Sequence, residues 1–86
     1  PITRILDDIE YKKELEKKLY EEYEEVIESN GDDRVEELAD MLEVIRALAK
    51  LEGKDLNEVI SVADIKNRRR GSFDEKVFLE KVIEPE

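Results

Sequence analysis

Apolar residues recur along the chain at the spacing of an α-helix. Between residues 11 and 27 they occupy the positions Tyr11, Leu15, Leu19, Tyr23, Val26 and Ile27. Steps of three and four residues place these side chains on one face, so the segment is predicted to form an amphipathic helix. Residues 35–51 and residues 56–63 repeat this spacing and predict two further helices.

Residue types that start and stop helices bound these segments. Asp7 and Asp33 are each followed by a Glu three residues later, which is a pattern of helix starts. Asn30-Gly31 and Gly53 suit the left-handed backbone that ends a helix. The chain is therefore predicted to be one all-α domain over residues 1–86. Its expected parts are an irregular start at 1–6, helices at about 8–29, 34–52 and 56–70, and a short extended arm at 71–86.

The central helix has an apolar sector too wide for one small protomer to cover. Between residues 35 and 51, the positions clearly outside this sector are Glu36, Glu43, Arg46 and Lys50. A chain of 86 residues can build only a thin core of its own. We therefore expect a three-helix protomer that forms a helical bundle by oligomerisation, as a dimer or a dimer of dimers.

Carboxylates interrupt the apolar stripes of both long helices. Glu22 falls inside the first stripe, with Glu25 at its edge and Glu21 turned away from its centre. Glu37 and Asp40 stand one turn apart, in and beside the second stripe. Burying an unpaired charge is costly, so these side chains are expected to meet around a compensating cation.

Composition narrows the chemistry of that cation and of any partner. The chain has no Cys and no His, so a metal must be held by oxygen, which favours Mg²⁺, Mn²⁺ or Ca²⁺. A net charge of −10 argues against binding to nucleic acid polymers or to anionic membrane surfaces. No apolar run is long enough to span a bilayer and no signal peptide is visible, so a cytoplasmic location is expected.

The acidic residues also form a motif. Glu21-Glu22-x-x-Glu25 and Glu37-x-x-Asp40 are separated by 11 residues, and together they resemble the EExxE…ExxD signature of the MazG-like all-α nucleoside triphosphate pyrophosphohydrolases. The run from Glu37 to Leu48 is similar to the E-L-A-D-V-L-E-V-I-x-A-L run of the phosphoribosyl-ATP pyrophosphohydrolase-like branch. The stretch that begins at Lys66 and ends in Arg70-Gly71-Ser72-Phe73 resembles that branch's K-x-x-x-R-G-G-F, with Ser72 in place of a Gly.

This resemblance implies a MazG-like fold and a Mg²⁺-dependent hydrolase, with Mn²⁺ as a possible substitute. The reaction would cleave a nucleoside triphosphate, or a related phosphorylated nucleotide, to a monophosphate and pyrophosphate. The metal ligands that it implies are Glu22, Glu25, Glu37 and Asp40. Glu21 is the candidate catalytic residue, as acceptor of a proton, and Glu25 is a second candidate for that role. The candidate phosphate-binding residues are Lys66, Arg69 and Arg70.

Two other functions remain open on the sequence. The chain fits a non-catalytic acidic helical oligomer or interaction module, as a degenerate relative of the family, and it fits a divalent-ion binder without hydrolysis. Members of the resembling branch usually begin with a basic segment of the type K-L-V-R-D-K-I-P, which is absent from residues 1–86. A trimmed chain and a shortened relative are both consistent with that difference.

Overall fold

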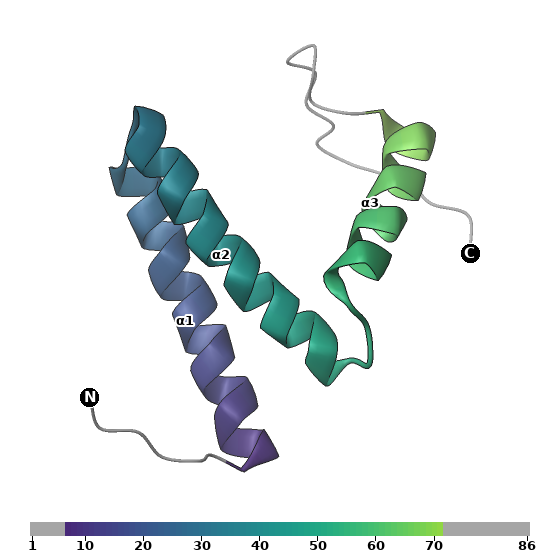
Figure 1. Cartoon of the computed structure of the whole chain (residues 1–86), viewed down its shortest axis with the longest axis horizontal. Helices are drawn as coiled ribbons and strands as arrows, with labels where there is room; N and C mark the ends of the chain where they lie inside the picture. The colour runs from purple at the N-terminus through teal and green to yellow at the C-terminus, as the bar shows by residue number, and fades with distance from the viewer. Residues whose placement is uncertain (1–6, 72–86) are drawn as a thin grey trace. The chain divides into compact units, whose positions relative to one another are not determined.

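Three α-helices make up the part of the chain that the structure, a computed structural model, describes: residues 7–71. They are α1 (Asp8–Glu28), α2 (Gly31–Leu51) and α3 (Leu56–Arg70), shown in Figure 1. Within this range there is no strand, so the all-α prediction is confirmed. The predicted irregular start at 1–6 lies outside the described residues, as does the predicted C-terminal arm apart from Gly71.

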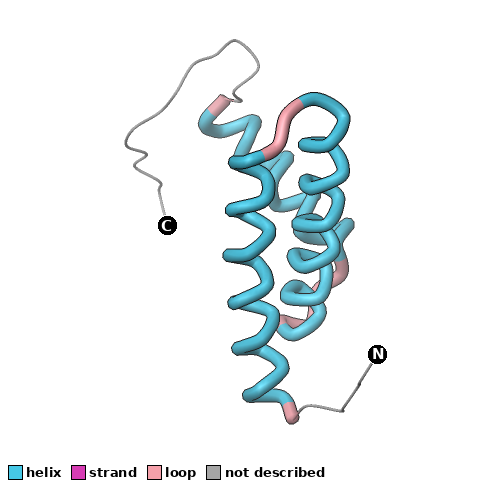
Figure 2. The backbone as a smooth tube through the Cα atoms, turned by 90° about the vertical axis from the view of Figure 1, so that its left-hand side faces the viewer, coloured by secondary structure: helices cyan, strands magenta, loops and turns pink. Residues whose placement is uncertain are grey.

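Helices α1 and α2 form an antiparallel hairpin and pack along one another, as both views of the backbone show (Figure 2). The start of α1 follows the sequence pattern, because the Asp7 carboxylate accepts a hydrogen bond of 2.8 Å from the Glu10 backbone N–H. This bond satisfies one of the free N–H groups at the helix N-terminus. The hairpin that follows brings the acidic positions of the two helices to neighbouring surfaces.

A very short turn joins the two long helices. The Ser29 hydroxyl donates a hydrogen bond of 3.0 Å to the Val26 carbonyl, and the Arg34 side chain donates one of 3.0 Å from Nε to the Ser29 carbonyl. Arg34 thus places its positive charge beside the carbonyl end of α1, where the helix dipole is negative. Its side chain fastens the start of α2 to the end of α1.

The prediction that the second helix starts near Arg34 is wrong by one turn. Helix α2 begins at Gly31, with Asn30 as its N-cap residue, so Asp33 lies inside the first turn. The reason is Gly31, whose φ of 58° lies in the left-handed region that glycine adopts without steric cost. This backbone reverses the chain within two residues and lets the helix resume at once, while Asp33 still favours the positive end of the dipole.

Helix α2 ends as its sequence predicts, within one residue. Gly53 has a φ of 75°. Its backbone N–H donates to the Lys50 carbonyl, and the Lys54 N–H donates to the Ala49 carbonyl, each at 3.0 Å. This pair of bonds is the Schellman arrangement, which satisfies the last carbonyl groups of a helix and needs a left-handed residue. The predicted stop at Gly53 is therefore confirmed.

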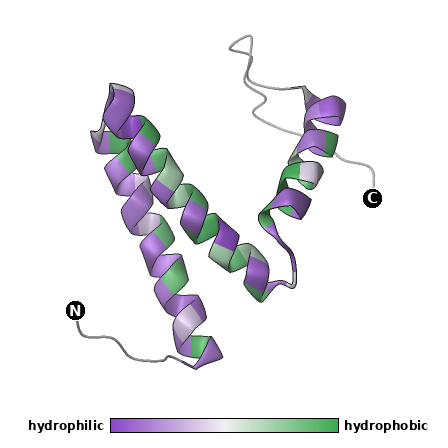
Figure 3. Ribbon diagram, in the orientation of Figure 1, coloured by the Kyte–Doolittle hydropathy of each residue, from purple (hydrophilic) through white to green (hydrophobic). Residues whose placement is uncertain are grey.

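The hairpin has a small apolar core. Among residues 7–71 the buried apolar side chains are Val44 and Ala49, both on α2. Both helices also contribute half-buried apolar residues, which are Leu15, Leu19, Val26, Met41, Ile45, Ala47 and Leu48. Figure 3 shows that hydrophobic residues are more frequent along α2 than along α1. Several large apolar side chains of both helices stay exposed, so the hairpin alone leaves part of its apolar surface in water.

Helix α3 belongs to a second compact unit. The chain divides into Pro1–Leu56, which holds the hairpin, and Asn57–Glu86, which holds almost all of α3. The bounds of α3 agree with the predicted helix at 56–70, while a single domain over the whole chain stays a prediction. Of the helices in residues 7–71, none combines the length and the apolar character that crossing a bilayer requires.

Candidate metal centre

Three glutamates from the two hairpin helices converge on one point. Glu22 and Glu25 come from α1, where a spacing of three puts them on adjacent turns, and Glu37 comes from the facing side of α2. Each contributes a carboxylate oxygen, and these three oxygens all lie within 4.8 Å of one another. We call these three residues the acidic cluster. Among residues 7–71 it is the one group of three or more acidic side chains close enough to share a cation.

Burial differs strongly across the acidic cluster. Glu22 is only 3% exposed, Glu37 is half-buried, and Glu25 is exposed. Glu22 is buried as the helical wheel predicts, because it lies on the same face of α1 as the half-buried Leu15 and Val26. A carboxylate this deep needs compensation for the water that it has lost, because a charge in apolar surroundings is strongly destabilising.

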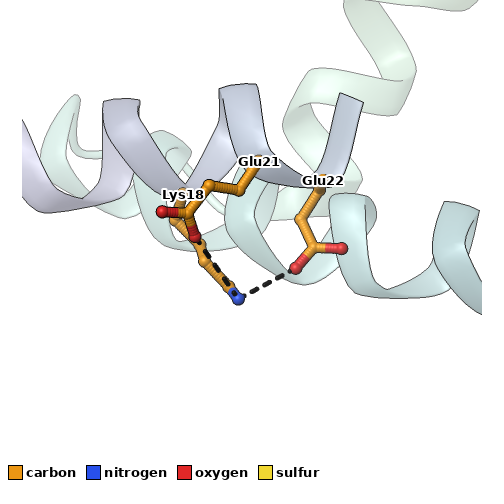
Figure 4. Close-up of polar contacts among 3 residues, drawn as sticks. All are labelled: Lys18, Glu21 and Glu22. Carbon is orange, nitrogen blue, oxygen red and sulfur yellow. Dashed lines mark ion pairs between the residues drawn. The ribbon is translucent and has the colours of Figure 1, made fainter. Parts of the chain in front are cut away.

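Lys18 supplies part of that compensation. Its Nζ lies 3.0 Å from Glu22 Oε1 and 4.0 Å from Glu21 Oε2, as drawn in Figure 4. The hydrogen bond to Glu22, together with the negative charge of that side chain, raises the pKa of Lys18 above its ordinary 10.5. Lys18 is therefore positively charged at neutral pH and forms an ion pair with one oxygen of Glu22.

Two other oxygens of the cluster lack such a partner. Glu22 Oε2 and Glu37 Oε2 are both buried, and neither has a hydrogen-bond partner among the described residues 7–71. Leaving buried polar atoms unsatisfied costs roughly 1–3 kcal/mol each, and more when the group is charged. Either a proton on a neighbouring carboxyl group or a bound cation could remove this cost.

The neighbouring carboxylates shift the pKa of Glu25. Its pKa is raised from 4.5 to about 7, first by hydrogen bonding with Glu37 and then with Glu22, and further by repulsion from both charges. The Glu25 side chain is exposed, but one of its carboxyl oxygens lies within 4.8 Å of an oxygen of each of the other two glutamates, close enough for them to shift its pKa. Near neutral pH, Glu25 therefore holds a proton for part of the time.

The structure leaves two predicted acidic residues outside the cluster. Asp40 is exposed and does not join the group of three, although it lies one turn after Glu37. Glu21 is exposed as predicted, and its carboxylate lies 4.0 Å from Lys18 Nζ. At 100° per residue, Asp40 turns toward the side of the hairpin on which Glu25 lies. We call the side formed by the acidic cluster together with Glu21 and Asp40 the acidic flank.

The predicted phosphate-binding residues belong to α3. Lys66 and Arg69 are exposed and Arg70 is half-buried, near the C-terminal end of that helix. Basic residues in a last turn suit the negative end of the helix dipole. All three lie in the second unit, and their role in binding phosphate stays a prediction.

Lys18 was not among the predicted site residues. The signal was available, because a Lys four residues before a Glu on one helix commonly forms an ion pair. The same helix also has lysines at positions 12, 13 and 17. Lys18 differs from them because it stands four residues before Glu22. That spacing matters because Glu22 is buried and its charge needs a partner.

The donor set of the acidic cluster fits a hard divalent cation. It contains only carboxylate oxygens, and two of them are buried without a partner among the described residues. Mg²⁺ and Mn²⁺ prefer such ligands, and Mg²⁺ commonly keeps several waters beside a few carboxylates.

Comparison of the chain with known protein families, with curated proteins and with solved structures finds no match. The case for a site therefore depends on this geometry.

Proposed function

We propose that the chain is a Mg²⁺-dependent nucleotide pyrophosphohydrolase, with Mn²⁺ as an alternative ion. It would cleave a nucleoside triphosphate, or a related phosphorylated nucleotide, to a monophosphate and pyrophosphate. The observation that carries the proposal is the convergence of Glu22, Glu25 and Glu37, with buried oxygens that have no partner among the described residues. The resemblance of these residues and Asp40 to the MazG-like signature supports this choice of reaction.

The charge of the acidic cluster explains why such an enzyme would need the ion. A polyphosphate and three carboxylates repel one another, so the cluster cannot attract the substrate directly. When bound, Mg²⁺ would neutralise both sides and lower the pKa of a coordinated water. In this proposal the buried Glu22, the half-buried Glu37 and the exposed Glu25 would hold the ion, and Glu25 would do so in its deprotonated form.

The remaining acidic residues have proposed roles on the acidic flank. Asp40 would complete the ligand set, since it follows Glu37 by one turn and turns toward the side of Glu25. Glu21 would accept a proton, because an exposed carboxylate beside the cluster can exchange that proton with water. Glu25 is a second candidate for this role, given a pKa of about 7. Phosphate oxygens would be bound by Lys66, Arg69 and Arg70.

Oligomerisation is part of the proposal, and exposed apolar residues on one side of the hairpin support it. Tyr23 and Ile27 of α1 are 51% and 60% exposed. Leu38 and Leu42 of α2 are 48% and 41% exposed. Helical spacing in an antiparallel pair turns all four to the side opposite the acidic flank. We call these four residues the apolar flank, and we propose that a second copy of the chain covers it in a dimer or a dimer of dimers.

The apolar flank is also what favours the second candidate function. A non-catalytic helical oligomer would need the apolar flank and would have no use for unpartnered buried carboxylate oxygens. A divalent-ion binder without hydrolysis would use the acidic cluster but not the basic end of α3. The proposed enzyme uses both the acidic cluster and the basic end of α3. No helix of the described chain could cross a bilayer. We propose that the enzyme acts in the cytoplasm.

Pyrophosphate release is the test of this function. The chain is supplied with Mg²⁺ and a panel of nucleoside tri- and diphosphates, and Asp40→Asn and Glu37→Gln are compared with it. We expect each variant to lose about a hundredfold or more in kcat, because losing a ligand disturbs both occupancy and geometry. Glu36→Gln, which removes the same charge from the neighbouring exposed position, should retain activity.

Two results would count against the proposal. If the chain releases neither pyrophosphate nor phosphate from any nucleotide, the non-catalytic oligomer becomes the better account. If it is active but Asp40→Asn retains that activity, the hydrolase stands while Asp40 drops out of the ligand set.

A further inference from the structure

Lys18 and Glu22 form an ion pair in which the two partners differ in their access to water. The Lys18 side chain is 52% exposed, whereas Glu22 is almost fully buried. Both residues lie on α1, one turn apart, so the 3.0 Å contact does not depend on how α2 packs. The lysine can therefore turn to solvent while the carboxylate cannot follow it, so Lys18 can leave Glu22 without a large cost only when another cation compensates that carboxylate.

The oxygens of Glu22 are used unequally. Oε1 accepts from Lys18, while Oε2 is buried with no hydrogen-bond partner among the residues described. A cation shared by Glu22, Glu25 and Glu37 would bind within a few ångströms of the Lys18 ammonium group. Two positive charges would then compete for one carboxylate, and each would weaken the hold of the other.

We infer that Lys18 is the built-in counter-ion of the acidic cluster and competes with a divalent cation for Glu22. This inference rests on the proposed function, because it concerns the same cation site. Without a divalent ion, Lys18 offsets the buried charge and keeps the hairpin folded. When a divalent ion arrives, the ammonium group gives up Glu22 and turns to water or to Glu21, which already lies 4.0 Å away. Lys18 thereby lowers divalent affinity and sets the ion concentration at which the site fills.

A different role for Lys18 makes the opposite prediction. If its main effect were to orient Glu22 for the ion, removing it would weaken ion binding. If it only stabilised α1, removing it would leave the affinity unchanged once the protein is folded. Competition alone predicts tighter binding of the divalent ion together with a less stable ion-free protein.

The test is a calorimetric titration of the whole chain with Mn²⁺ alone, and then with Mg²⁺ alone, for the unchanged protein and for Lys18→Met. We expect Lys18→Met to bind about tenfold more tightly, the size of effect that one nearby charge has in a partly solvated site. Its melting temperature in EDTA should be lower than that of the unchanged protein. Lys18→Gln is titrated in parallel, so that a folding defect of one variant does not decide the result.

Two matched variants separate local competition from general charge effects. Lys17→Met removes the same charge from the adjacent exposed residue, which has no ion pair among the contacts of residues 7–71, and its affinity should stay within about twofold. Lys18→Arg keeps the charge and should restore the affinity of the unchanged protein. Equal or weaker binding by both Lys18→Met and Lys18→Gln would overturn the inference while leaving the ion site intact. Failure of the unchanged protein to bind either ion would overturn the ion site and this inference together.

Discussion

The two flanks of the α1–α2 hairpin are incomplete in different ways. On the acidic flank, carboxylates crowd together with one lysine as counter-ion, and two buried oxygens lack a partner among the described residues. On the apolar flank, four large side chains remain between 41% and 60% exposed. The first surface has an unmet electrostatic requirement and the second an unmet hydrophobic one. A cation can complete the first, whereas only another apolar surface can complete the second.

This difference explains how a thin hairpin could still be a stable part of a larger assembly. With only Val44 and Ala49 buried among its apolar residues, the described hairpin gains little from its own core. Covering the apolar flank would add burial from both protomers at once. Filling the acidic flank would add binding energy that only the folded state receives. The two contributions can be removed one at a time, which makes the comparison testable.

The largest expected effect comes from placing a charge on the apolar flank. Leu38→Asp should weaken self-association at least about a hundredfold, because each copy would have to bury an unpaired carboxylate at a cost of roughly 3 kcal/mol. Sedimentation velocity over a range of concentrations measures this. Ala39→Asp is the control, since the same charge stands on the next residue, which is exposed and turned away from the hairpin contact. A monomeric unchanged chain at micromolar concentration would contradict the oligomer.

The next effect concerns the acidic flank and is measured by thermal unfolding. Saturating Mg²⁺ should raise the melting temperature by about 10–20 °C over EDTA at equal ionic strength, the range expected for a ligand at about a hundred times its Kd. Glu37→Gln should abolish the difference, because it removes a half-buried member of the cluster. Glu36→Gln should keep it. If Glu37→Gln responds to Mg²⁺ as the unchanged chain does, the ion does not bind at this cluster.

A smaller effect is the pH dependence of the ion-free protein. The pKa of Glu25 is about 7 in the folded chain and 4.5 as its ordinary value, so between these values the folded state holds more protons than the unfolded state. Stability from this group must therefore fall as pH rises from about 4.5 through about 7. Melting curves in EDTA should show this fall, and Glu25→Gln should flatten it while Glu24→Gln does not. A slope that is unchanged in Glu25→Gln would contradict the contact among the three carboxyl groups.

Much of the hairpin could be predicted from local sequence. The periodic apolar residues predicted the three helices, and Asp7 and Gly53 marked ends that the structure confirms. The start of α2 could not be predicted from its acidic pattern. A left-handed Gly31 allowed the helix to begin before Asp33, and the choice between the two starts depends on how tightly the hairpin closes.

The acidic cluster was partly predictable for the same reason. The helical wheel indicates which side of its own helix a residue occupies, so it placed Glu22 in the apolar stripe and Glu37 on the facing side of α2. It does not indicate how far a side chain at the edge of the contact can reach. Asp40 stands at that edge and stays exposed, while Glu25 stands at a similar angle and reaches the cluster. The partner chosen by Lys18 likewise depended on how deeply Glu22 is buried.

Binding of Mn²⁺ followed by electron paramagnetic resonance tests the central claim most directly, because free and bound ion give different signals. The unchanged chain should remove free Mn²⁺ in a saturable way, and Mg²⁺ should compete for the same site. Glu22→Gln should abolish this binding and still fold, since a neutral amide is easier to bury than a carboxylate. Equal Mn²⁺ binding by Glu22→Gln and by the unchanged chain would contradict a cation site built on Glu22, Glu25 and Glu37.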